Sequence, residues 1–375
     1  MGTTTNSSLQ TETIRNNFVM DKYKYTPDYP VAPGATLKEA LDERGLSQTD
    51  LAVRLGMSEK TISQIINGVA PITYETAEKL ELVLGIPAHY WNRRELAFRE
   101  AIARIEATER LQSEIAWLDE LPIKFLREWK HLTAEDKPGL VRQALQFFGV
   151  SSVEAWRSAF IKPSAQFRGK AVQEKRPGYV AAWLRIGDLQ AAGIESAPFS
   201  PDEFRRALAD IRGMTTWSAQ KWFKELPVRC AAGGVAVVFT REIPSAAVSG
   251  ATRWLTKDKA LIQLSLKFKT DDQIWFTFFH EAGHILLHGR KQVFVEYGHS
   301  NATDEEREAN EFACETLIPQ AFSARLPSLQ AKSQIVEFAA SIGISPSLVL
   351  GRLQHDKLIH PVLFNDLKTK LKWSS

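Results

Sequence analysis

Apolar residues recur every three or four positions near the start of the chain, which predicts short helices with tight connections. The first helix is expected over Thr36–Arg44. Ser47 is the expected N-cap of the second, with Asp50 three residues later at the capping-box position. Gly56 then supplies the positive φ that a sharp turn between two helices needs. This order of elements predicts a helix-turn-helix.

The third helix of this group separates its apolar and polar residues onto two faces. Ser58 is the expected N-cap, and Ile62, Ile65 and Ile66 are expected to face inward. In a helix-turn-helix the second helix of the pair enters the major groove, where Gln, Ser and Thr can read base edges and Lys can contact a guanine or a phosphate. The outward residues expected to face DNA are Glu59, Lys60, Thr61, Ser63 and Gln64.

Farther along the chain the pattern stays helical and then changes period. Apolar clusters around Trp117 and Trp183 predict amphipathic helices without evident chemistry. After Gly233, β-branched runs predict strands at Val235–Thr240 and Ala260–Leu266. Further helices are expected at residues 272–288, 304–317 and 334–342. The predicted fold class is therefore mostly α with a small β-sheet, an α+β protein.

These changes divide the chain into four predicted parts. They are a polar N-terminal arm (1–35), a five-helix helix-turn-helix domain (36–110) and a helical middle region (111–226). The last part is a domain that carries the candidate metal-binding and catalytic residues, with a C-terminal helical extension (227–375). We expect the arm to be mobile because it is polar and interrupted by prolines.

Composition narrows the class of protein. The chain has 375 residues, of which 44% are hydrophobic and 24% charged, enough for two or three cores. The 47 basic and 44 acidic residues nearly cancel, which excludes a strongly cationic DNA-coating protein. The two cysteines cannot form a disulfide scaffold, and neither a secretory signal nor an apolar run of about 18 residues is evident. We therefore expect a cytoplasmic protein with no membrane partner.

The charge of the helix-turn-helix stretch bears on DNA binding. Residues 36–110 carry 12 acidic and 10 basic side chains. Because attraction to phosphates supplies most of the affinity for DNA, binding is expected to need a dimer that presents Lys60, Lys38, Lys22 and Lys24 together. A domain that contacts only protein is the alternative.

One helix carries a single ionisable stripe, in the segment Trp275–His288. With about 100° per residue, His284, Glu281 and His288 lie roughly 40°, 100° and 80° from His280. The rest of the helix is apolar, which indicates burial around a polar site. Two imidazoles at i and i+4 can both reach a Zn²⁺ ion, and a glutamate after the first can take a proton from water. The HExxH pattern thus predicts His280 and His284 as metal ligands and Glu281 as the general base.

Zinc needs a third protein ligand. Arg290 stands where the extended metzincin motif has a histidine, so the acidic helix at 304–317 is the better source. Its Ala309, Phe312 and Ala313 form the expected inward face, and Glu308 and Glu305 border it.

Other side chains near the motif have less defined roles. His288 is a catalytic candidate that could orient substrate or stabilise the oxyanion, or it could instead hydrogen-bond to a ligand. Tyr297 and His299 could also donate to the oxyanion. Cys314 is expected to be a buried packing residue rather than a ligand.

The N-terminal motif resembles a known family. The stretch LKEALDERGLSQTDLAVRLGMSEKTISQIINGVAPITYETAEKLELVLGIPAHYW is similar to the XRE (Cro/repressor-like) family, in particular to its HigA-type antitoxins. The resemblance implies operator binding, with Gln48 holding the DNA backbone and residues Ser58 to Gln64, including Lys60 and Thr61, facing bases. It also implies a cognate toxin as a partner.

The C-terminal motifs resemble a second family. HEAGHILLH followed by EREANEFACETLIP is similar to the ImmA/IrrE family of zinc-dependent peptidases, and the likeness extends from about Val235 to Val349. It implies a zincin-like fold and a protein substrate, commonly a transcriptional repressor. The zinc ligands that it implies are His280, His284 and Glu308, with Glu281 as the base. Glu305 remains the reserve ligand, and the sequence leaves open which divalent ion is bound.

Three hypotheses about function follow. The first is a DNA-binding regulator fused to a zinc endopeptidase that cleaves a repressor or regulatory protein, with the strand at Ala260–Leu266 offering an exposed edge to an extended peptide. The second is a non-catalytic, antitoxin-type regulator whose C-terminal fold senses a metal or a partner toxin. The third is a peptidase whose N-terminal domain binds only protein.

Overall fold

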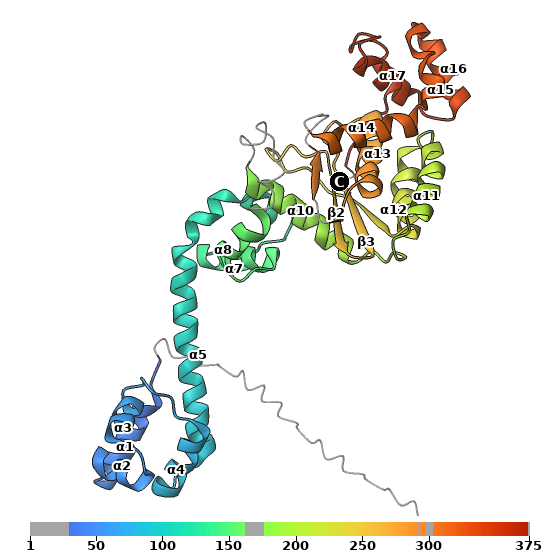
Figure 1. Ribbon diagram of the computed structural model, residues 1–375. Helices are drawn as coiled ribbons and strands as arrows, with labels where there is room; N and C mark the ends of the chain where they lie inside the picture. Colours follow the sequence, from blue (N-terminus) through green and yellow to red (C-terminus); the bar gives the residue numbers. More distant parts are fainter. Residues whose placement is uncertain (1–29, 162–175, 291–292, 297–302, 374–375) are drawn as a thin grey trace, which may run out of the picture. The chain divides into compact units, whose positions relative to one another are not determined.

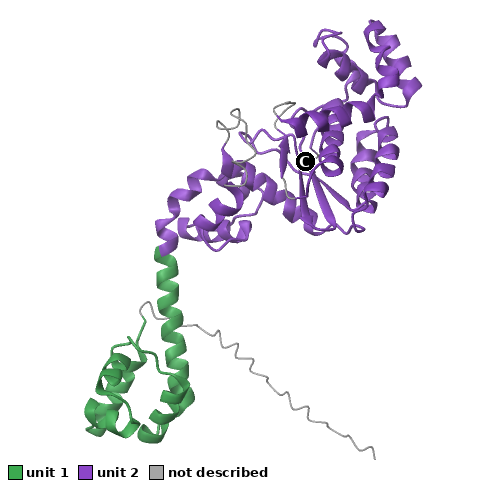
Figure 2. Cartoon of the chain, viewed as in Figure 1, with its two compact units in different colours: residues 1–109 green, residues 110–375 purple. Residues whose placement is uncertain are grey.

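The computed structural model describes residues 30–161, 176–290, 293–296 and 303–373. The chain divides into two compact units, residues 1–109 and residues 110–375 (Figure 2). Helix α5 (Ala88–Ser113) runs through the boundary between them. Most of the predicted arm lies outside the described residues.

The first unit is entirely helical in its described part. Its elements before α5 are α1 (Pro33–Arg44), α2 (Gln48–Leu55), α3 (Glu59–Ile66) and α4 (Tyr74–Leu84). The first helix begins at Pro33, three residues earlier than the prediction, because proline fits the first turn of a helix.

Local signals set the geometry of the α2–α3 pair. The Ser47 hydroxyl accepts a hydrogen bond from the Asp50 amide at 3.0 Å, and the Asp50 carboxylate accepts one from the Ser47 amide at 3.0 Å. Gly56 follows with φ of 65°, and Ser58 caps α3 by accepting from the Thr61 amide. The predicted capping box and turn glycine are therefore confirmed.

The second unit combines helices with a small sheet (Figure 1). Its elements after α5 are η1 (Ile115–Glu120), α6 (Ile123–Glu128), α7 (Lys137–Phe148), α8 (Val153–Trp156), η2 (Arg157–Ile161), α10 (Pro177–Ala192), α11 (Pro201–Met214), α12 (Ala219–Ala232), β1 (Val235–Phe239), β2 (Gly250–Thr256), β3 (Lys259–Leu264), α13 (Asp271–Leu287), β4 (Phe294–Glu296), α14 (Asp304–Leu317), α15 (Gln320–Ser323), η4 (Leu326–Ser328), α16 (Lys332–Ile342), α17 (Pro346–His355) and η5 (Asn365–Leu367). The α+β class is confirmed.

The sheet has the strand order β1-β3-β2-β4. β1 and β3 are parallel, with Val235 opposite Ala260, whereas β2 is antiparallel to both β3 and β4. The expectation that the strand at Ala260–Leu266 offers a free edge is wrong, because β3 is hydrogen-bonded on both sides. The edges of the described sheet are β1 and β4.

Helices cover both faces of this sheet. Val235, Val237 and Ile262 are buried in one core with the inward residues of α11, α12 and α13. The alternate residues Ala236 and Leu261 are buried on the other face, which α10 covers. Helices α10 to α12 therefore pack with the strands that follow them. The end of the predicted middle region, Leu226, lies in a core that it shares with residues of the sheet. The three predicted domain boundaries stay predictions.

A buried polar network fixes α10 to the sheet. The Gln263 amide on β3 donates to the Trp183 carbonyl at 2.7 Å and accepts from Arg253 at 2.9 Å. Arg253 in turn forms an ion pair with Asp188 at 2.7 Å. Gly187 lies where a methyl group would overlap the Gln263 amide. The helix can approach this closely only because that position has no Cβ.

Within the described residues, no single helix is long and apolar enough to cross a membrane. The pair α16 and α17 would meet such a test by combined length and composition, but the two helices meet at 116°. Both contribute buried residues to the core that contains α13.

Replacing glycine by alanine at two helical positions is expected to change the free energy of unfolding in opposite directions. Gly187→Ala should lower the free energy of unfolding by about 1–3 kcal/mol, because the methyl group displaces the buried Gln263 amide. Gly213→Ala on α11 meets no heavy atom within 4 Å and should raise it by about 0.4–1 kcal/mol. Urea unfolding followed by tryptophan fluorescence measures both. Equal effects of the two variants would contradict the close packing of α10 on the sheet.

Candidate metal centre

Helix α13 carries the predicted polar stripe inside the protein. Trp275, Phe278 and Phe279 are buried in the core on its apolar side. On its polar side His280, Glu281 and His284 are at most 2% exposed. The helix ends at Leu287, one residue short of the prediction, so His288 has an extended backbone. Burying these polar groups costs free energy unless they find hydrogen-bond or ion-pair partners, or a bound ion, inside the protein.

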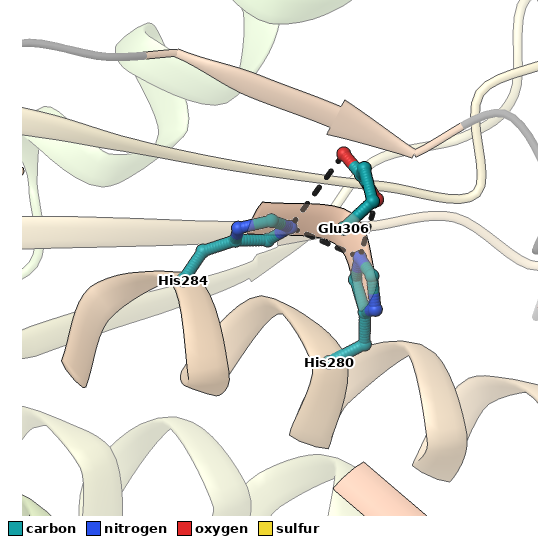
Figure 3. Close-up of side chains that lie close together, drawn as sticks. All are labelled: His280, His284 and Glu306. Carbon is teal, nitrogen blue, oxygen red and sulfur yellow. Dashed lines mark hydrogen bonds and ion pairs between the residues drawn. The ribbon is translucent and has the colours of Figure 1, made fainter. Parts of the chain in front are cut away.

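Two imidazoles and one carboxylate converge on a single point (Figure 3). His280 Nε2 and His284 Nε2 are 3.0 Å apart. Glu306 places one carboxylate oxygen 3.2 Å from His280 Nε2 and the other 3.8 Å from His284 Nε2. Ligands of a tetrahedral zinc ion with bonds of about 2.0–2.1 Å would be roughly 3.3 Å apart. Among the described residues, this is the group that fits a shared metal ion.

The carboxylate at this point belongs to Glu306, not to either predicted glutamate. Glu306 is 18% exposed, whereas Glu308 is 50% exposed and contacts His288 Nε2 at 3.2 Å. Glu305 is not part of the group either. The helical period explains the difference, since Glu306 lies one turn before the buried Ala309 and the half-buried Asn310, which contacts His280. Glu306 was not among the predicted ligands, although its spacing from Ala309 and Ala313 on the helix was a usable signal.

Hydrogen bonds to the far nitrogens determine which nitrogen of each histidine faces the site. A carboxylate can only accept, so His288 donates from Nε2 to Glu308, and in this tautomer its Nδ1 is an acceptor. His284 must then donate from Nδ1 to His288 at 3.0 Å, which leaves a lone pair on its Nε2. His280 Nδ1 lies 2.9 Å from the Asn310 Oδ1 and donates to it. In these tautomers the Nε2 atom of each ring faces Glu306 and is the nitrogen available to a metal ion.

Glu281 lies beside this group in a space that β2 leaves open. A Cβ on Gly250 would be 2.6 Å from the Glu281 carboxylate, so glycine makes room for it. The carboxylate is fully buried and has no hydrogen-bond partner among the described residues. Burial accordingly raises the pKa of Glu281 to about 8. A buried carboxylate with a raised pKa is suited to accept and release a proton near neutral pH.

The charges around the histidines favour a cation between them. Burial opposes protonation of His280, but contact with Glu306 and the charges of Glu281 and Glu296 raise its pKa to about 9. Burial instead lowers the pKa of His284 to about 4. Although burial also opposes ionisation of Glu306, its contacts with the two histidines lower its pKa to about 2. The donor set therefore fits a divalent ion.

The structure also locates the remaining candidates of this region. Phe294 on β4 stacks on the His284 ring, with centroids 3.9 Å apart and an interplanar angle of 14°. Cys314 is partly buried on α14, and burial raises the pKa of its thiol. Tyr297 and His299 lie outside the described residues.

The expected DNA-facing residues lie along the surface of α2 and α3. Gln48 begins α2 and is exposed, as is Lys60 on α3. Ser58 is exposed, but its hydroxyl is already engaged in capping α3 through the Thr61 amide at 3.1 Å. Thr61 and Gln64 are partly buried. Their contact with DNA stays a prediction.

Comparison with protein families gives two matches. Residues 37–91 match the family described as "Helix-turn-helix", and residues 236–354 match a peptidase family described as "IrrE N-terminal-like domain". The second match contains the histidine pair and Glu306. Comparison with curated proteins gives no match.

Two solved structures are similar to part of the chain. An addiction module antidote protein of the HigA family from Coxiella burnetii is 26% identical, with a TM-score of 0.21, over 23% of this chain and 94% of its own. An antidote protein of a plasmid maintenance system from Nostoc punctiforme is 27% identical, with a TM-score of 0.22, over 22% of this chain and 92% of its own. By the two family matches, residues 37–91 are similar to XRE-type helix-turn-helix domains and residues 236–354 are similar to metallopeptidase-like domains of the ImmA/IrrE kind.

Proposed function

We propose that the C-terminal unit is a zinc-dependent endopeptidase whose metal ligands are His280, His284 and Glu306. The observation that supports this proposal best is the convergence of three donor atoms from α13 and α14 next to a buried, unpartnered glutamate. A site that only stored or sensed a metal would gain nothing from burying Glu281 there, because an unpaired buried carboxylate is costly.

The roles of the side chains follow from their positions. A divalent ion held by this group would supply Lewis-acid polarisation of the peptide carbonyl and a more acidic water. Glu281 would accept the proton of the attacking water and pass it to the leaving amine. Both nitrogens of His288 are engaged, by His284 and Glu308, so His288 fits a positioning residue for His284 better than the predicted oxyanion donor.

The edge strand β4 is the better candidate for binding an extended peptide. Its Phe294 stacks on His284, and the Glu296 carboxylate lies 3.3 Å from His280 Nε2. A peptide pairing with β4 would therefore pass the ligand group, with main-chain hydrogen bonds that tolerate many sequences. We propose a protein substrate, such as a transcriptional repressor.

The N-terminal unit is proposed to bind operator DNA as a dimer through α3. The capped α2–α3 pair and the exposed Lys60 support this role. Cleavage by the C-terminal unit would then regulate transcription by the same chain or by a second repressor, and a cognate toxin remains a further proposed partner.

The two neighbouring glutamates of α14 are expected to differ in zinc binding. Glu306→Gln removes a ligand and should weaken zinc binding at least about a hundredfold. Glu308 reaches the ligand His284 only through His288, so Glu308→Gln should weaken zinc binding by no more than about tenfold. Competition with a fluorescent chelator measures both. If only Glu308→Gln loses zinc, the ligand implied by the motif is correct and Glu306 is not a ligand.

Glu281→Gln is expected to separate zinc binding from catalysis. The variant should keep zinc, because Glu281 is not in the ligand group, but its rate of peptide hydrolysis should fall by about 10²–10⁴-fold. Mass spectrometry of a digested peptide library measures the rate. A zinc-loaded variant that cuts as fast as wild type would show that Glu281 is not the base, and a wild-type chain that binds zinc and DNA without cutting would favour the non-catalytic regulator.

Lys60→Ala is expected to weaken DNA binding through the loss of one phosphate contact. The slope of log K against log salt should become shallower by about one. Lys79→Ala is the matched control, since Lys79 lies on α4 and is paired with Glu75 at 2.8 Å. Fluorescence anisotropy with the DNA upstream of the coding sequence measures both slopes. Identical slopes for the two variants would contradict the proposed role of α3.

A further inference from the structure

A cavity of about 460 Å³ continues the seam between α13 and α14 beyond the metal ligands. Gln273 and Phe276 line it from α13, two turns and one turn before His280, respectively. Cys314 and Leu317 line it from α14, two and three turns after Glu306, and Leu348 of α17 closes it. The two helices that hold the ligand group therefore also form the walls of this cavity.

Two lining residues contact a metal ligand directly. The Phe276 ring lies 6.5 Å from the His280 ring, centroid to centroid, with an angle of 27° between them. The Asn310 Oδ1 lies 2.9 Å from His280 Nδ1. The cavity thus begins one side chain away from the ligand group, on the side of His280 that carries Nδ1.

The chemistry of the walls selects an apolar group. Phe276, Leu317, Ile318 and Leu348 contribute aromatic and aliphatic surface. The charged side chains that line the cavity are paired within the protein: Arg307 with Glu311 at 3.1 Å, Arg352 with Asp356 at 2.6 Å and Asp272 with Lys368 at 2.8 Å. The volume is within the range of about 300–1,000 Å³ that is usual for sites that bind small organic groups.

We propose that this cavity is the specificity pocket of the peptidase and that it receives a large apolar side chain of the protein substrate beside the scissile bond. This inference rests on the proposed peptidase function. Filling the cavity should then change which bonds are cut without changing zinc binding, since no lining residue belongs to the ligand group.

Cys314 allows a test with a matched control. The zinc-loaded full-length chain and its Cys314→Phe and Cys314→Ser variants would each digest a peptide library, with cut sites read by mass spectrometry. Wild type and Cys314→Ser should favour Leu, Met or Phe at one position beside the cut. Cys314→Phe fills the cavity and should lower cleavage at those residues relative to Ala or Gly by about tenfold or more, with unchanged zinc content.

The same thiol gives a second measurement that does not depend on turnover. Cys230 is fully buried and burial raises the pKa of its thiol, so a maleimide should label Cys314 first. A peptide with Phe beside the cut should slow that labelling, and the matched Ala peptide should not.

The outcomes separate the two proposals. If the chain cuts peptides with no side-chain preference, or with a preference that Cys314→Phe leaves unchanged, the cavity is not the specificity pocket. The proposed peptidase function is not contradicted by that result. Failure of the zinc-loaded wild type to cut any library peptide overturns both. If a free small molecule slows maleimide labelling of Cys314 and neither peptide does, the cavity binds an effector. That result would overturn its proposed role as a substrate site.

Discussion

The burial of one ionisable stripe on an otherwise apolar helix is the constraint on which the site depends. His280, Glu281 and His284 are almost completely inaccessible, although water would solvate them better than protein does. The cost of burying them is offset because Glu306 of α14 and Glu296 of β4 contact His280, and Gly250 of β2 leaves room for the Glu281 carboxylate. Two ring nitrogens that face each other at 3.0 Å, with several carboxylates around them, form a pocket of negative potential that favours a positive charge. A divalent cation supplies that charge at one point, and a low dielectric makes its attraction strong.

Short-range physics made part of this structure predictable. The caps Ser47 and Ser58 and the turn at Gly56 each depend on residues at most three or four positions away, so they could be predicted correctly from sequence. The pairing of His280 with His284 is likewise a consequence of the helical period alone. The start of α1 at Pro33 and the end of α13 at Leu287 show that helix boundaries shift by a few residues even where the element itself is certain.

Long-range pairing was not predictable in the same way. The position of β3 in the middle of the sheet depends on its pairing with β2, and no prediction was made for β2 or for the edge strand β4. β2 contains Gly250 and Arg253, which look unlike an interior strand until their partners are known. Gly250 faces Glu281, and Arg253 is neutralised by Asp188 on α10. The function of each residue is thus set by a segment distant in sequence, and residue type alone does not reveal it.

Glu306 and Glu308 show how two similar residues acquire different roles on one helix. Two positions correspond to about 200° of rotation, so only one of them can face α13 at the ligand histidines. Glu306 reaches both Nε2 atoms, whereas Glu308 remains half exposed and reaches only His288. From there Glu308 still acts on the site, since it fixes the proton on His288 and, through it, the lone pair of His284. The acidic helix therefore contributes one carboxylate placed to bind a metal ion and one that contacts His288, and the helical phase decides which is which.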